Sequence, residues 1–172
     1  MHASLARAPA KGAITLHAVT AADAPGWLAR HGNGALARAC GFSGAEGALA
    51  PLPGKDGRIA AWVLGLGTRR DAFALAAAAE KLPAGLYRLG EVPDWCGGAH
   101  AALAWIMGGY RFARYRKSKK SGARLMVPPR VDGEEVSRIA EHLFLGRDLV
   151  NTPANDMGPA ELEAAARALA RT

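Results

Sequence analysis

The sequence predicts an α/β fold, in which a three-layer domain with a mixed β-sheet flanked by helices is followed by a linker and an isolated C-terminal helix. Short apolar segments typical of strands alternate with helical segments through most of the 172 residues, and this alternation is characteristic of layered α/β domains. Residues 53–57, Pro-Gly-Lys-Asp-Gly, separate two strand-like segments and predict a β-hairpin. Residues 95–107 are apolar on nearly every side, which predicts a helix buried against the sheet.

The first elements follow from strand alternation and from helix-breaking residues. Residues 12–20 alternate apolar side chains and are expected to form the first strand. Residues 22–41 are expected to form a broken helix or two short helices, because the Gly-Asn-Gly sequence at 32–34 interrupts them. The hairpin strands are expected at 48–52 and 58–66, on either side of the turn.

The remaining elements complete the sheet and its helical layers. An alanine-rich helix is expected at 70–82, where the proline that follows ends it. Short strands are expected at 85–89 and 123–127. Asp94 is expected to cap the buried helix that begins at the next residue.

Two helices are expected at the C-terminal end of the chain. The first spans 134–150, and its apolar stripe consists of Val136, Ile139, Ala140, Leu143 and Val150. Pro159 fits the first position of the second helix, whose inward stripe consists of Leu162, Ala165, Ala166 and Leu169. A helix this short is marginal in water unless it packs on a partner. Residues from 151 onward are therefore expected to be mobile or docked on a neighbouring molecule, while 12–150 form the stable fold.

The net charge of +7 comes from one segment of the chain. Elsewhere the basic and acidic residues balance, at 15 each. We call residues 110–124 the basic-aromatic segment, and its candidate binding residues are Tyr110, Arg111, Phe112, Arg114, Tyr115, Arg116, Lys117, Lys119, Lys120 and Arg124. Arginine and lysine pair with phosphates while bases stack on aromatic rings, so one hypothesis is a nucleic-acid-binding module. The alternative is a solvated loop whose aromatic side chains anchor it to the core.

No pattern in the sequence predicts catalytic or metal-ligating residues in this chain. The five histidines are scattered, with no pair at metal-ligand spacing. Residues 65–67, Gly-Leu-Gly, follow a strand, but Arg70 stands where a dinucleotide-binding motif needs its third glycine, so a strand-ending turn is the better interpretation. No apolar run approaches the roughly 20 residues of a membrane helix, and residues 1–20 show no secretory signal. Cys40 and Cys96 are expected to be reduced, partly buried thiols in a cytoplasmic protein, with a disulfide as the less favoured alternative.

Two segments resemble one known family. Residues 146–156, Gly-Arg-Asp-Leu-Val-Asn-Thr-Pro-Ala-Asn-Asp, are similar to the sequence that opens the catalytic domain of the leucyl aminopeptidase (cytosol aminopeptidase) family. We call them the junction segment. Residues 108–120 resemble the Tyr-Arg-Phe…Tyr-Lys stretch that ends the non-catalytic domain of bacterial members. The resemblance implies three parts: a non-catalytic α/β domain at 1–132, a bridging helix at 133–150, and the start of a truncated catalytic domain at 151–172.

The family resemblance also implies what the parent protein does. It would be a cytoplasmic homohexamer that removes N-terminal, preferentially leucine-like residues from peptides. Its catalytic domain would bind two divalent ions, typically manganese or zinc, which activate a bridging water. The ligands of those ions lie beyond the junction segment in the family, so this chain alone is expected to hold no catalytic or metal residue and no cofactor, and to be inactive. Because the basic-aromatic segment matches a family pattern, its charge is weaker support for binding nucleic acid.

Overall fold

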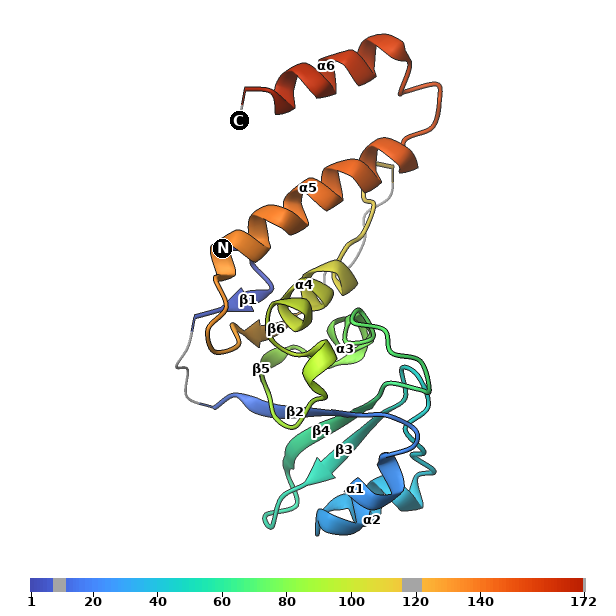
Figure 1. Cartoon of the computed structure of the whole chain (residues 1–172), viewed down its shortest axis with the longest axis vertical. Helices are drawn as coiled ribbons and strands as arrows, with labels where there is room; N and C mark the ends of the chain where they lie inside the picture. The colour runs from blue at the N-terminus through green and yellow to red at the C-terminus, as the bar shows by residue number, and fades with distance from the viewer. Residues whose placement is uncertain (8–11, 116–121, 172) are drawn as a thin grey trace.

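The computed structural model describes residues 1–7, 12–115 and 122–171. Its centre is a six-stranded sheet in the order β1-β6-β5-β2-β4-β3 (Figure 1). Every neighbouring pair of strands is parallel except β3 and β4, so the predicted mixed sheet is confirmed. The strands are β1 (Leu5–Ala6), β2 (Ile14–Val19), β3 (Leu49–Pro53), β4 (Ile59–Gly65), β5 (Gly85–Leu89) and β6 (Ala123–Met126).

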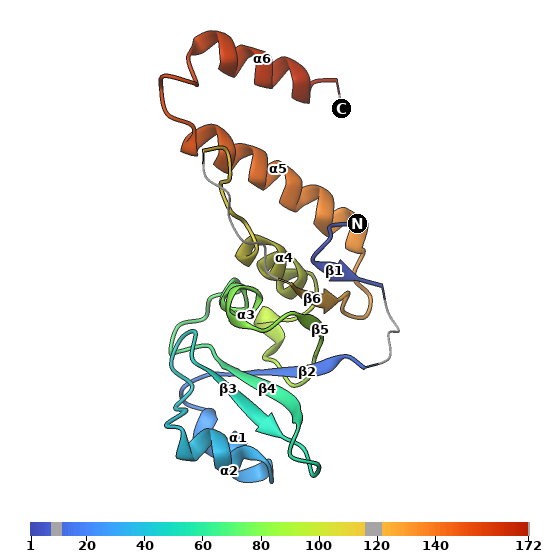
Figure 2. The same cartoon turned by 180° about the vertical axis from the view of Figure 1, so that it is seen from behind.

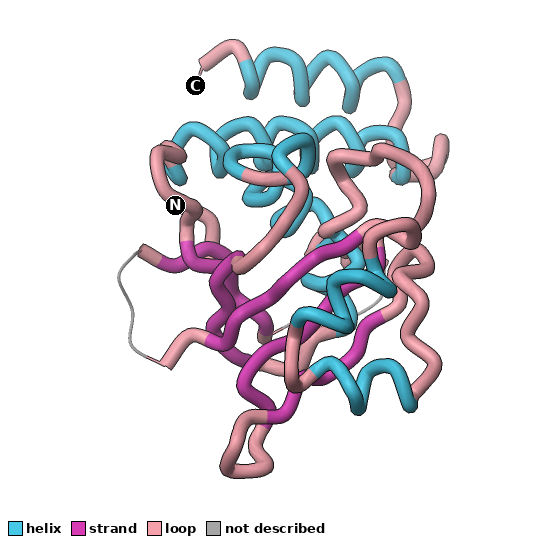
Figure 3. Tube along the Cα trace, turned by 60° about the horizontal axis from the view of Figure 1, so that its bottom comes forward, coloured by secondary structure: helices cyan, strands magenta, loops and turns pink. Residues whose placement is uncertain are grey.

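Helices cover both faces of the sheet, which confirms the predicted three-layer α/β fold (Figure 3). They are α1 (Ala24–Arg30), α2 (Gly34–Ala39), α3 (Ala76–Lys81), α4 (Gly98–Gly108), α5 (Gly133–Asn151) and α6 (Pro159–Leu169), with a 3-10 turn η1 (Asp94–Cys96) before α4. Trp27 of α1 belongs to one apolar cluster and Trp105 of α4 to the other. Alternation along β2 separates the two clusters: Leu16 joins that of α4, and Val19 joins that of α1.

Most elements lie where the sequence predicts them, but β1 is an addition. The hairpin of β3 and β4 is confirmed, and the interrupted segment forms the two short helices α1 and α2. Strand β1 pairs in parallel with β6 at the edge of the sheet, and Leu5 is fully buried there. A strand of two residues shows no alternation, so only its pairing with a distant segment reveals it.

Two helices begin later than predicted. Helix α3 starts at Ala76 and not at residue 70, because the Asp71 carboxylate accepts a hydrogen bond from the Phe73 amide at 2.8 Å. Such local bonds between side chain and backbone compete with helix formation. The prediction that Asp94 caps a helix from residue 95 is wrong: its side chain caps nothing, and it lies in η1. Gly98 adopts φ +56°, a left-handed conformation that separates this turn from α4.

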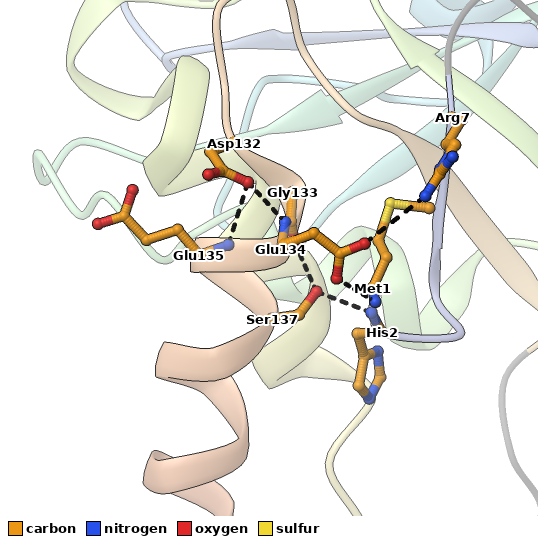
Figure 4. Close-up of polar contacts among 8 residues, drawn as sticks. All are labelled: Met1, His2, Arg7, Asp132, Gly133, Glu134, Glu135 and Ser137. Atoms are coloured by element: carbon orange, nitrogen blue, oxygen red, sulfur yellow. Dashed lines mark hydrogen bonds and ion pairs between the residues drawn. The ribbon is translucent and has the colours of Figure 1, made fainter.

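The first turn of α5 is fastened to the N-terminal segment (Figure 4). Asp132 caps the helix by accepting from the amides of Glu134 at 2.9 Å and Glu135 at 3.2 Å. The hydroxyl of buried Ser137 accepts from the His2 amide at 2.7 Å. The bond between Ser137 and His2 connects the helix to the segment that leads into β1, so the edge strand and α5 are held together.

Only two of the five positions predicted for the apolar stripe of α5 are buried. Val136 and Ala140 are buried and Phe144 packs beside them, which defines a contact face repeated every four residues. Ile139 and Leu143 are each 43% exposed, and Val150 is 85% exposed, so the prediction is wrong at these three positions. Helical spacing identifies apolar positions but cannot decide which of two adjacent faces meets the domain.

Helix α6 lies beyond α5, on the side away from the sheet (Figures 1 and 2). Pro159 occupies its first turn, as predicted, and the Glu161 carboxylate accepts from the Gly158 amide at 3.0 Å. None of its residues is buried within this chain, and Leu162 is 53% exposed. That it is mobile or docked on a neighbour stays a prediction.

Gly108 allows α4 to approach α3 closely. A Cβ at this position would lie 2.2 Å from the carbonyl oxygen of Ala76, so Gly108→Ala should force the helices apart and lower the free energy of unfolding by about 1–3 kcal/mol. Gly146→Ala is the matched control, because nothing lies within 4 Å of its added methyl group and alanine favours helix by up to about 1 kcal/mol. Urea unfolding should therefore show opposite signs, and equal effects would contradict this account of the α3–α4 contact.

The cap at Asp132 gives a second stability test. Asp132→Ala removes the acceptor of two helix amides and should cost about 1 kcal/mol of unfolding free energy. Asp132→Asn retains a capping oxygen and should cost much less. Thermal and urea unfolding of the two variants measure the difference. A loss in Asp132→Asn as large as in Asp132→Ala would mean that the cap does not hold the helix.

Candidate functional site

The basic-aromatic segment is the site that the sequence singles out. The structure describes its residues 110–115 and 122–124. The predicted residues Arg116, Lys117, Lys119 and Lys120 lie outside the described part of the chain. The candidate site is therefore built from the remaining side chains, which meet the junction segment.

Tyr110 connects the end of α4 to the last turns of α5. Its hydroxyl donates to the Asp148 carboxylate at 2.6 Å and accepts from the Asn151 side-chain amide at 3.1 Å. Its ring lies 5.0 Å from that of Phe144, and the Arg147 guanidinium sits 5.3 Å from its centroid. Desolvation, followed by the hydrogen bond to Asp148, raises the pKa of the Tyr110 phenol. Tyr110 thus remains a neutral donor to the junction segment at neutral pH.

Tyr115 makes a second contact with the junction segment. Its hydroxyl donates to the carboxylate of Asp156, and this bond raises the pKa of the Tyr115 phenol. Phe112 contacts its ring edge-on at 5.8 Å, and the Arg114 guanidinium lies 5.7 Å from its centroid. The side chain is 54% exposed, so this contact is weaker than the one at Tyr110. Two segments far apart in sequence, both carrying the resemblance, are thus in direct contact.

Two arginines of the basic-aromatic segment, Arg111 and Arg124, make polar contacts within the chain. Arg111 forms a 3.0 Å ion pair with Glu80 and donates to the Tyr110 carbonyl at 2.7 Å. Arg124 donates to the carbonyl of Leu5 at 3.1 Å and so contacts strand β1. These guanidinium groups support the fold, and phosphate binding would have to compete with their present partners.

A cavity of about 450 Å³ lies between these elements. Its walls include the rings of Trp105, Tyr110 and Phe144, together with His2 and Asp148. The indole Nε1 of Trp105 is buried and has no hydrogen-bond partner among the described residues. The lining offers aromatic surface, which suits contact with an apolar group, and a few polar groups, among them the Ser4 hydroxyl at 2.8 Å from the His2 Nδ1.

One group of three side chains in the described part of the chain has metal-binding potential: His17, His31 and Glu91. Their candidate ligand atoms all lie within 4.8 Å of one another. Sequence spacing does not reveal this group, because its members come from a strand, a helix end and a loop. The sequence places His17 within a predicted strand and Glu91 just after another, but this placement does not indicate that the two side chains meet.

Comparison with known proteins assigns the family. The sequence profile of the M17 aminopeptidase, N-terminal domain, matches residues 14–128. The chain belongs to the M17 aminopeptidase family. The predicted resemblance to leucyl (cytosol) aminopeptidases is thereby confirmed, and the matched residues include the whole sheet apart from β1.

Relatives of this M17 chain are cytosol aminopeptidases and similar enzymes. A probable cytosol aminopeptidase of Leifsonia xyli is 34% identical over 160 residues, which cover 83% of this chain and 32% of the relative. The crystal structure of cytosol aminopeptidase from Coxiella burnetii superposes with a TM-score of 0.82 at 27% identity, covering 98% of this chain and 37% of the other. The bottromycin maturation enzyme BotP matches with a TM-score of 0.67 at 26% identity over 93% of this chain and 37% of its own. BotP is also known in complex with Mn.

The M17 chain spans about a third of the length of these relatives. The comparisons therefore concern its N-terminal domain and the helices that follow. Among the described residues, no helix is long and apolar enough to cross a membrane.

The contact between Tyr110 and Asp148 should stabilise the junction. Tyr110→Phe removes the hydroxyl and keeps the ring, so unfolding free energy should fall by about 1 kcal/mol at neutral pH. The pKa of the phenol is raised in the folded chain, so the contribution is present below the unfolded pKa and is lost as pH rises above about 10. In alkali, the Tyr110→Phe variant should therefore lose less unfolding free energy than the unsubstituted chain. Tyr115→Phe, at an exposed position, is the control and should change stability less; equal losses would contradict the assignment.

Proposed function

We propose that this chain is the non-catalytic N-terminal part of a leucyl aminopeptidase-like metallo-exopeptidase, which hydrolyses N-terminal amino acids from peptides. The observation that carries the proposal is the match of residues 14–128 to the N-terminal domain of M17 aminopeptidases. The parts are those expected from the sequence: an α/β domain at 1–132, a bridging helix at 133–150, and the beginning of the catalytic domain at 151–172. The names of the relatives from Leifsonia and Coxiella support this activity for the parent.

The parent's chemistry would use two divalent ions, manganese or zinc, and the manganese complex of BotP supports a metal cofactor. The described residues of this chain do not fit such a pair of ions. Two ions about 3.5–4 Å apart need more ligands than three side chains supply, and the described metal-competent cluster consists of His17, His31 and Glu91. No step of peptide hydrolysis is therefore assigned to residues of this chain, and we expect the chain alone to be inactive.

The role proposed for this chain is to position the catalytic domain. The bridging helix α5 is fixed to the α/β domain at its start by Ser137 and near its end by Tyr110. A domain that follows the junction segment would therefore have a defined orientation relative to the sheet. The exposed apolar side chains of α6, including Leu162, would be covered by that domain.

The assembly and cellular location belong to the same proposal. The parent would be a cytoplasmic homohexamer with peptide substrates, as the family resemblance implies. The word cytosol in the names of the relatives supports the location. The nucleic-acid-binding alternative is not favoured by the described arginines, because Arg111 and Arg124 are used within the chain. It stays a prediction that rests on lysines outside the described residues.

An activity assay tests the proposal. The 172-residue chain, incubated with manganese or zinc and a leucyl chromogenic amide, should show no turnover, because no two-metal ligand set is present among its described residues. Full-length Coxiella cytosol aminopeptidase serves as the positive control in the same buffer. Metal-dependent hydrolysis that coelutes with the pure chain would overturn the non-catalytic assignment. A longer product of the same reading frame should release leucine when either metal is added, and failure to do so would overturn the proposed parent activity.

A further inference from the structure

A polar cluster lies at the carboxyl end of the sheet, where β2 and β5 are neighbours. The chain leaves β2 towards α1 on one face and leaves β5 towards α4 on the other, so the connections diverge there (Figure 1). In α/β sheets, this divergence opens a crevice in which ligands bind. His17 is on β2, Glu91 follows β5, and His31 is the C-terminal cap of α1.

His31 is held in the orientation that a metal ligand requires. Its Nδ1 lies 2.9 Å from the Trp27 carbonyl. A carbonyl can only accept, so Nδ1 carries the proton and, in the neutral ring, the lone pair is on Nε2. The Trp27 ring stacks on the imidazole at 3.8 Å and fixes its plane. Metal-binding histidines commonly donate their second ring N–H to a carbonyl in this way.

Glu91 faces the Nε2 atom of His31 and is oriented by the same tryptophan. Its Oε1 lies 3.0 Å from the His31 Nε2, and its Oε2 accepts from the Trp27 indole at 2.9 Å. Two ligands of one tetrahedral ion with bonds of about 2.0–2.1 Å are separated by roughly 3.3 Å. The two atoms therefore need to move apart by only a few tenths of an ångström, and the Glu91 side chain is 58% exposed.

His17 completes the group with a second imidazole. Its ring centroid lies 5.6 Å from that of His31. The pKa of the His17 side chain is lowered, chiefly by burial, and this favours the neutral form that binds a metal. Its Nδ1 accepts from the Glu91 amide at 3.0 Å. Binding an ion requires His17 to give up this bond or to turn its ring, so it should contribute less affinity than His31.

We propose that His31, Glu91 and His17 bind one divalent transition-metal ion of the zinc class. Two imidazoles and a carboxylate form a ligand set that zinc prefers, with a fourth position left for water. No metal ligand is expected from the sequence, and this site is independent of the catalytic metals proposed for the parent. The ion would clamp the end of α1 to the loop after β5. The alternative is an ion pair between protonated His31 and Glu91.

Metal titration of the 172-residue chain tests the proposal. Cys40→Ser is introduced first, because its exposed thiol would otherwise bind zinc. After treatment with a chelator, calorimetry with Zn²⁺ should show one equivalent bound, and Co²⁺ should give the visible absorption of a tetrahedral site. His31→Ala and Glu91→Gln should each weaken binding by at least about tenfold. His17→Ala should weaken it by less than His31→Ala.

Two further variants separate ligation from general effects. His142→Ala is the matched control, because this exposed histidine also contacts a helix carbonyl but is not in the metal-competent group of the described residues. The affinity of this variant for Zn²⁺ should equal that of the Cys40→Ser chain. Trp27→Phe keeps an aromatic ring but removes the indole donor to Glu91, so it should weaken binding. Circular dichroism confirms that each variant is folded. The proposal is overturned if the Cys40→Ser chain binds no equivalent of metal. It is also overturned if the folded His31→Ala and Glu91→Gln variants bind metal as well as the Cys40→Ser chain does.

Discussion

The burial of helix α4 is the constraint on which the rest of the structure depends. The helix is apolar on nearly all sides and carries Trp105 and Ile106 at full burial. It therefore needs covering by the sheet, by α3 and by α5 together. Gly108 permits the contact with α3, because a larger residue would collide with the backbone of Ala76. Because α5 covers α4, the buried face of α5 is part of the hydrophobic core of the domain.

The packing of α4 also determines where the junction segment lies. The chain emerges from α4 at Tyr110, which immediately contacts Asp148 on α5. Because α5 is also held at its first turn by Ser137, both ends of the helix are fixed to the same domain. Tyr110 and Tyr115 of the basic-aromatic segment hold that segment against the junction segment. These contacts hold α5 against the M17 N-terminal domain at both ends of the helix.

The histidine cluster depends on a different part of the fold. Alternation along β2 directs Leu16 into the core beneath α4 and His17 towards α1 on the opposite face. Trp27 then packs between the apolar cluster and the two imidazoles, and it bonds Glu91 through its indole nitrogen. The polar group therefore lies over the face away from α4 and α5. Its chemistry can change without disturbing the contacts that hold the junction segment.

The sequence by itself determined the layers of this protein and its family. Alternation, the turn at 53–57 and the apolar helix fixed the α/β class and the order of elements, because these signals are local and follow from backbone geometry and solvent exclusion. The junction segment resembles the aminopeptidase family closely enough to indicate it, and the family match at 14–128 confirms the assignment.

Only the tertiary structure decided which distant residues meet. Strand β1 has no periodicity of its own and exists through its pairing with β6. The buried face of α5, the contact of Tyr110 with Asp148 and the approach of His17 to His31 all depend on how elements are rotated and packed. Spacing along a chain constrains neighbours within one element. It does not determine contacts between elements, because these depend on the whole set of packing constraints acting together.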